Sequence, residues 1–99
     1  MVVHSWYWRS AHWSLEFEYF FQIQASAELR QEFIEQNSMQ RVDATGTEAP
    51  DRYFDRYFHD KPAWFLPKAR DRYEVWASGS FLMYVDKESG DLFLTECQV

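Results

Sequence analysis

Histidine, cysteine and paired acidic residues are the side chains of this sequence that could do chemistry. His4 and His12 are eight positions apart and His59 stands far from both, so none has a partner at the spacing of an HExxH metal site. Cys97 is the one cysteine of the chain, whereas a structural zinc site needs four cysteine or histidine ligands. We therefore predict no metal and no other cofactor.

Cys97 also lacks the surroundings of a nucleophile. A reactive thiol needs a lowered pKa and an adjacent base, and the neighbouring residues supply neither. The segments 45–47 and 78–80 resemble neither a nucleophile elbow nor a phosphate-binding loop, and the chain has only three glycines. We predict no catalytic residue, and we interpret Cys97 as a small apolar residue that packs at the edge of a sheet.

Glu16, Glu18 and His59 form the polar site of an alternative hypothesis. Glu16 and Glu18 lie two positions apart in a strand-like segment and so share a face. In a cleft such a pair could do acid–base work, but we favour surface charges, although Phe20 on the same face suggests partial cover or a binding face. His59 follows Asp55 at helical spacing, and stabilisation of a last helical turn is its favoured role.

The most distinctive pattern combines aromatic residues with arginine. Residues 51–58 repeat Asp-Arg-Tyr-Phe, and on a helix positions four apart are neighbours, which would stack Phe54 and Phe58 into a ridge. Tyrosine, tryptophan and arginine dominate the binding energy of protein interfaces. The alternative is that Phe54, Phe58, Trp64 and Leu66 simply cover a sheet and leave Arg52, Tyr53 and Arg56 in solvent. The predicted partner-binding residues are Arg52, Tyr53, Arg56, Tyr57 and Trp64.

Periodicity predicts the elements that would position these residues in the first half of the chain. Apolar side chains alternate over 13–23, which predicts a half-buried strand with its odd-numbered residues in the core. Trp6 and Trp8 either extend that strand or form a preceding one. Ser26 is a suitable N-cap for a helix that reaches about residue 40. Pro50 favours the start of a second helix, which ends near residue 61.

The sequence pattern of the second half of the chain predicts an antiparallel meander, that is, consecutive strands joined by short turns. Apolar runs at 73–77, 81–85 and 92–97 are joined by glycine-containing turns. The element order β(β)-α-α-β-β-β predicts an α+β fold, in which about four antiparallel strands carry two helices packed on one face. A chain of 99 residues is the size of a single domain.

Composition narrows the class of function. The chain has 10 Lys and Arg against 16 Asp and Glu, a net charge of −6, which disfavours direct binding of nucleic acid. The charge suits a basic partner, although it also serves solubility alone. We expect a cytoplasmic protein without membrane contact, because the single cysteine excludes an internal disulfide and no signal peptide or long apolar run is present.

The leading hypothesis is a small acidic binding protein that inhibits or escorts a larger, preferentially basic, protein partner, as immunity and anti-defence proteins do. This hypothesis rests on the negative net charge and on a surplus of aromatic residues, which make up 20% of the chain. The first alternative is an enzyme or small-ligand binder with an aromatic-lined pocket between sheet and helices. The second is a homodimer formed through an aromatic face or through an exposed strand edge at 92–97.

Overall fold

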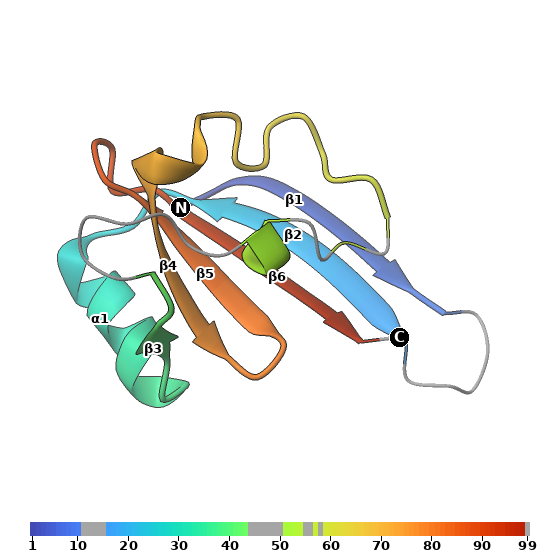
Figure 1. Cartoon of the computed structure of the whole chain (residues 1–99), viewed down its shortest axis with the longest axis horizontal. Helices are drawn as coiled ribbons and strands as arrows, with labels where there is room; N and C mark the ends of the chain where they lie inside the picture. Colours follow the sequence, from blue (N-terminus) through green and yellow to red (C-terminus); the bar gives the residue numbers. More distant parts are fainter. Residues whose placement is uncertain (11–15, 44–50, 55–56, 58, 99) are drawn as a thin grey trace.

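The structure is a computed structural model that describes residues 1–10, 16–43, 51–54, 57 and 59–98. Its main element is a six-stranded antiparallel sheet in the order β1-β2-β6-β5-β4-β3 (Figure 1). The helix of the described part is α1 (Ala27–Gln36), and two short 3₁₀ turns are η1 (Asp51–Tyr53) and η2 (Arg70–Arg72). The strands are β1 (Val2–Arg9), β2 (Phe17–Ile23), β3 (Gln40–Arg41), β4 (Tyr73–Ser78), β5 (Phe81–Asp86) and β6 (Leu92–Gln98).

The predicted fold class was wrong, because the described part of the chain is mostly β, with six strands and one helix in place of four strands and two helices. The three predicted strands of the C-terminal meander are confirmed as β4, β5 and β6. Of the two alternatives for Trp6 and Trp8, the structure has the separate preceding strand, β1. Where the second helix was predicted, the described residues form the 3₁₀ turn η1 and chain without regular secondary structure. Phe54 of the repeat is buried in the core, and tertiary burial of this kind overrides helix propensity. Residues 55, 56 and 58 of the repeat lie outside the described residues.

β6 lies in the middle of the sheet, between β2 and β5. The predictions of an exposed edge at 92–97 and of Cys97 at a sheet edge were therefore wrong. Cys97 pairs in register with Glu18 of β2, and the true edges are β1 and β3. A strand's own alternation reports which side chains share a face but not which strands lie beside it.

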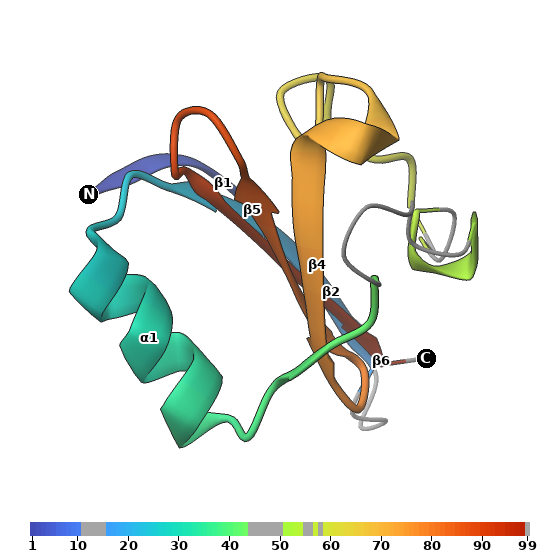
Figure 2. The ribbon, with the colours of Figure 1, turned by 60° about the vertical axis from the view of Figure 1, so that its left-hand side comes forward.

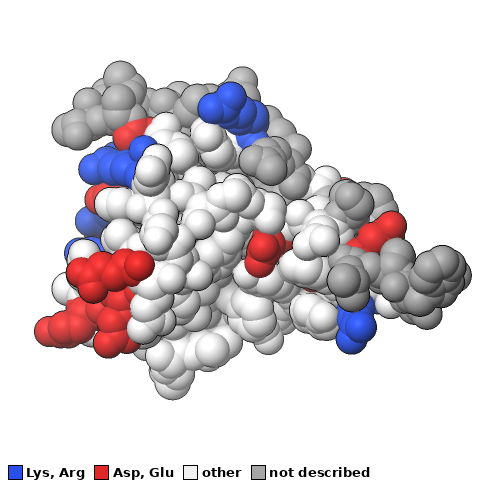
Figure 3. All heavy atoms as spheres, turned by 90° about the horizontal axis from the view of Figure 1, so that it is seen from below, with Lys and Arg blue, Asp and Glu red and all other residues white. Residues whose placement is uncertain are grey.

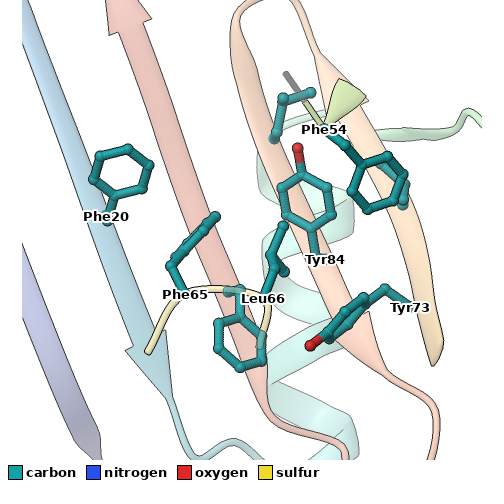
Figure 4. Close-up of a cluster of buried hydrophobic side chains, with 9 residues drawn as sticks. Phe20, Phe54, Phe65, Leu66, Tyr73 and Tyr84 are labelled. Atoms are coloured by element: carbon teal, nitrogen blue, oxygen red, sulfur yellow. The ribbon is translucent and has the colours of Figure 1, made fainter. Parts of the chain in front are cut away.

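The two faces of the sheet are covered by different material, and Figure 2 shows α1 on one side and the chain that follows η1 on the other. This corrects the prediction of two helices on one face. On the side of the irregular segment 51–72, aromatic rings dominate a first core cluster (Figure 4). The cluster's buried members are Phe20, Phe54, Phe65, Leu66, Tyr73, Val75, Leu82, Tyr84 and Phe93.

The second core cluster lies between the sheet and α1. Phe33 and Ile34 of the helix pack against it. Its buried members are Met39, Met83, Val85, Leu92 and Leu94. None of the residues of α1 is itself buried, so this short helix covers only part of its face of the sheet.

The helix begins as predicted but ends earlier. The Ser26 side chain accepts a hydrogen bond of 3.2 Å from the Leu29 amide, which confirms it as the N-cap. The helix ends at Gln36, because Ser38 adopts a left-handed φ of 49° and the chain then enters β3. None of the helices in the described ranges combines the length and the apolar stretch that a membrane crossing requires.

Strand β2 is covered on both faces, which the alternation did not predict. Glu18 and Phe20, expected on the outer face, are completely buried. Tyr19 and Phe21, expected in the core, are only half-buried. The segment 51–72 supplies the cover over Glu18 and Phe20, and α1 supplies a smaller one on the other side.

Asp86 holds the turn between β5 and β6. Its Oδ1 accepts hydrogen bonds from Arg72 Nε at 2.7 Å and from the amides of Glu88 and Ser89 at 2.9 and 3.2 Å. Burial raises the pKa of the Asp86 carboxyl, but the hydrogen bond from Arg72 and those from the two amides outweigh it. The net effect is a pKa below the ordinary aspartate value.

We expect Asp86→Asn to lower the free energy of unfolding at pH 7 by about 1–3 kcal/mol, because the hydrogen bonds to the carboxylate lose their charge. Since the folded-state pKa is depressed, this contribution is present above the unfolded pKa of about 4 and is lost as the pH falls through the folded value. Urea denaturation from pH 7 to pH 2 should therefore show the variant and the wild type converging in acid. The exposed Asp60, changed to Asn, is the matched control; a difference for Asp86→Asn that does not vary with pH would contradict the prediction.

Candidate functional site

Glu18 and His59 meet in the structure, although 41 positions separate them. Glu18 is completely buried on β2, and its Oε1 accepts a hydrogen bond of 2.8 Å from the backbone amide of His59. The His59 Nδ1 lies 2.8 Å from the same oxygen. The histidine side chain remains 31% exposed. The pair therefore connects the buried face of β2 to the surface of the covering segment.

Two tryptophans of the edge strand enclose this pair. The His59 ring lies 4.7 Å from the Trp8 ring and 5.2 Å from the Trp6 ring, centroid to centroid. Trp8 stands opposite Glu18 in the register of β1 and β2. Both tryptophans are half-buried, and their rings pack on the imidazole that contacts the Glu18 carboxylate.

The structure thus unites two of the three residues predicted for a polar site and separates the third. The prediction of Glu18 as a surface charge was wrong, and His59 does not end a helix, because the irregular segment follows η1 there. Asp55, its predicted neighbour, lies outside the described residues. Glu16 precedes β2 and, with Tyr7 among others, lines a separate open cleft of about 240 Å³.

We call the contact between the Glu18 carboxylate and His59 the clamp, because it joins the covering segment to β2. The Glu18 Oε1 atom accepts a hydrogen bond from the backbone amide of His59 and also lies within hydrogen-bonding distance of the Nδ1 atom of the same histidine. A carboxylate beside an imidazole fixes the orientation and tautomer of the ring, and here it also fixes the covering segment to the sheet. Among the described residues, no group of three or more histidine, cysteine, aspartate and glutamate side chains could hold a metal ion.

The residues predicted to bind a partner do not share one helical ridge. Arg52 is exposed, with its Cζ 5.0 Å from the centre of the Tyr53 ring. Tyr53 packs against the first core cluster, and its carbonyl accepts a hydrogen bond from the Tyr84 hydroxyl. Arg56 lies outside the described residues.

Tyr57 and Trp64 lie further along the same layer. The Tyr57 ring contacts Phe20, with 5.5 Å between centroids, and Trp64 stacks on His4 of β1 at 5.0 Å. Both are half-buried against the first core cluster. Tyr53, Tyr57 and Trp64 therefore contribute to the cover of the sheet. The alternative explanation had predicted this role for Trp64, but it had left Tyr53 in solvent.

An aromatic surface lies on the opposite face of the sheet, and its members on β2 are residues that the periodicity assigned to the core. Tyr7 is 60% exposed and stands directly opposite Tyr19 in the register of β1 and β2. The rings of Phe17 and Phe21 flank Tyr19 at 6.2 and 5.3 Å, centroid to centroid. Together with two half-buried side chains of the meander they form what we call the aromatic face: Tyr7, Phe17, Tyr19, Phe21, Trp76 and Phe81.

Acidic side chains stand on and beside the aromatic face, and Arg9, which pairs with Phe17 in register, is a basic residue at its β1 edge. Glu96, opposite both Tyr19 and Phe81 in register, accepts hydrogen bonds from the Tyr19 hydroxyl at 3.1 Å and from Ser80 Oγ at 3.0 Å. Burial, followed by the charge and the hydrogen bond of Glu96, raises the pKa of the Tyr19 hydroxyl. Figure 3 views this side and shows a broad uncharged surface, with acidic side chains gathered at the end where α1 lies. The exposed acidic residues of that helix are Glu28, Glu32 and Glu35.

Comparison with models of protein families, with curated proteins and with solved structures found no match to this chain.

Replacing Glu18 by glutamine tests the clamp. We expect the free energy of unfolding to fall by about 1–3 kcal/mol, because a buried hydrogen-bonded carboxylate is exchanged for a neutral amide that accepts more weakly. Urea denaturation followed by tryptophan fluorescence measures the change. Glu32→Gln on the exposed surface of α1 is the matched control and should change stability by less than about 0.5 kcal/mol. Equal stability of the two variants would show that the clamp contributes nothing.

Proposed function

We propose that the protein binds another protein through the aromatic face. The observation that carries the proposal is the cluster of six aromatic side chains on one side of the sheet, which α1 leaves partly uncovered. Partly exposed tyrosine, tryptophan and phenylalanine supply large contact areas at a low entropic cost, and they are enriched in protein interfaces. An apolar patch of this kind on a small domain is typical of an interaction site.

The acidic side chains on and beside the aromatic face favour a partner whose contact surface is apolar at its centre and basic where it meets those side chains. Glu96 stands within the aromatic face, and the acidic side chains of α1 lie at one end of it. The net charge of −6 would speed the encounter with such a partner. A small domain that docks by one flat face acts by covering part of its partner, as an inhibitor or adaptor does.

The aromatic face is a better candidate for this contact than the arginine and aromatic residues of the segment 51–72. Tyr53, Tyr57 and Trp64 pack against the first core cluster, so their rings are already engaged with the sheet. Tyr7, by contrast, is 60% exposed. We therefore expect the anchoring contacts to be made from β1 and β2.

Tyr7→Lys is the variant that tests this proposal. It places a cation on the aromatic face and should weaken binding to a basic partner by about 10-fold or more, the loss expected at an anchoring residue of an interface. Ala63→Lys is the matched control, because it makes the same change of charge at an exposed position in the layer on the other side of the sheet. Tagged wild type and both variants are used to capture proteins from host lysate, and the captured protein is then purified for affinity measurements.

The proposal is supported if one protein binds the wild type and Ala63→Lys equally, binds Tyr7→Lys at least about 10-fold more weakly, and protects amides of β1 and β2 from hydrogen exchange. Equal binding to all three proteins would exclude the aromatic face. Sedimentation of the purified wild type and of Tyr7→Lys tests whether the aromatic face instead binds a second copy of this chain. A wild-type dimer that Tyr7→Lys dissociates would contradict the proposed basic partner.

A further inference from the structure

A cleft of about 200 Å³ opens beside η1 and η2, in the layer that covers the sheet opposite the aromatic face. Its floor is apolar and largely aromatic. Phe54, Leu66 and Tyr73 are buried there, and Tyr57 is half-buried. Figure 4 shows Phe54 and Tyr73 beside the rest of the first core cluster, which holds both rings in place. Leu66 adopts a left-handed φ of 50°, a costly conformation for leucine that is concentrated at ligand sites in proteins.

The other described residues that line the cleft are basic. They are Lys61, Lys68 and Arg70, three of the ten lysine and arginine residues of a chain with net charge −6. Lys61 Nζ donates a hydrogen bond of 3.0 Å to the Phe65 carbonyl, and the Arg70 guanidinium lies 5.0 Å from the centre of the Phe54 ring. No acidic residue is among the described residues that line the cleft.

Two of these cations have no anionic partner within the described ranges. Neither Lys61 nor Lys68 forms an ion pair there with a carboxylate. By comparison, Arg72 nearby is paired with Asp86 and Glu88 at 2.7 and 3.2 Å. Two ammonium groups held beside one cleft repel each other, and an anion placed between them would relieve that repulsion.

We infer that this cleft binds a small aromatic anion, such as an aryl carboxylate or an aryl phosphate. Its volume of about 200 Å³ exceeds the roughly 150 Å³ of a cavity that holds benzene and is below the roughly 300–1,000 Å³ of pockets for drug-sized ligands. One ring with one charged group fits between these limits. The ring packs on Phe54 and Tyr73, and the anionic group pairs with Lys61 and Lys68.

The inference does not rest on the proposed docking function. The cleft and the aromatic face lie on opposite sides of the sheet, and they are lined by different residues. Their ligands also differ in charge, because the partner proposed for the aromatic face is basic, whereas the ligand inferred for the cleft is an anion. A failure of either proposal therefore leaves the other intact.

Titration of the whole protein with phenyl phosphate, benzoate, inorganic phosphate and benzyl alcohol tests the inference, with backbone amide NMR shifts as the readout. We expect saturable shifts around the cleft with phenyl phosphate or benzoate. The ring and the charge each contribute, so inorganic phosphate and benzyl alcohol should bind at least about 10-fold more weakly. Absence of saturation by either aryl anion up to about 10 mM, or equally tight binding of inorganic phosphate, would overturn the inference.

Variants of the lysines assign the site. The double variant Lys61→Gln/Lys68→Gln should bind the aryl anion at least about 10-fold more weakly, because both ion pairs are lost. Lys68→Gln alone should give a smaller loss, and since that side chain is exposed the fold does not depend on it. Lys87→Gln, the remaining lysine, which lies outside the cleft, is the control and should bind within about twofold of the wild type. Unchanged affinity in Lys68→Gln and in the double variant would refute this site.

Discussion

The ring of Phe65 lies where the covering segment meets three strands of the sheet. Its centroid is 4.9 Å from Phe20 on β2, 6.0 Å from Tyr84 on β5 and 5.6 Å from Phe93 on β6, each in an edge-on arrangement. Phe65 is completely buried. The segment 51–72 contains only two short 3₁₀ turns within its described residues, so repeated hydrogen bonds contribute little to its position. Aromatic packing of this kind, together with the Glu18 clamp on His59, holds it on the sheet.

This use of irregular chain as a layer explains the difference between the two sides of the molecule. The segment buries a wide aromatic cluster, whereas α1 is a ten-residue helix with no buried residue. The sheet is therefore well covered on one side and only partly covered on the other. Both proposals follow from that difference: the aromatic face is what α1 leaves accessible, and the basic cleft is a gap that the irregular segment leaves at its own surface.

The candidate sites could be predicted from the sequence only in part. Glu18 and His59 were candidates for one polar site, but their direct contact depends on the fold of the covering segment, which brings residues 41 positions apart together. Lys61, Lys68 and Arg70 are close in sequence, yet their common cleft forms only because Phe54 and Tyr73 place its floor there. Phe17, Tyr19 and Phe21 of the aromatic face were assigned to the core, because alternation on β2 shows which residues share a side and not what covers that side.

The sequence by itself determined the local elements with strong signals. They are the strand predicted over 13–23, which the described residues show as Phe17–Ile23, the N-cap at Ser26 and the three strands of the meander, since each depends on a few neighbouring residues. It also determined the charge and the aromatic content on which the proposed partner chemistry depends. Tertiary structure alone decided that β6 is central, that the described residues of the Asp-Arg-Tyr-Phe repeat form a 3₁₀ turn and no α-helix, and that Glu18 is buried. These outcomes depend on which distant segments compete to bury the same sheet, and no local pattern records that competition.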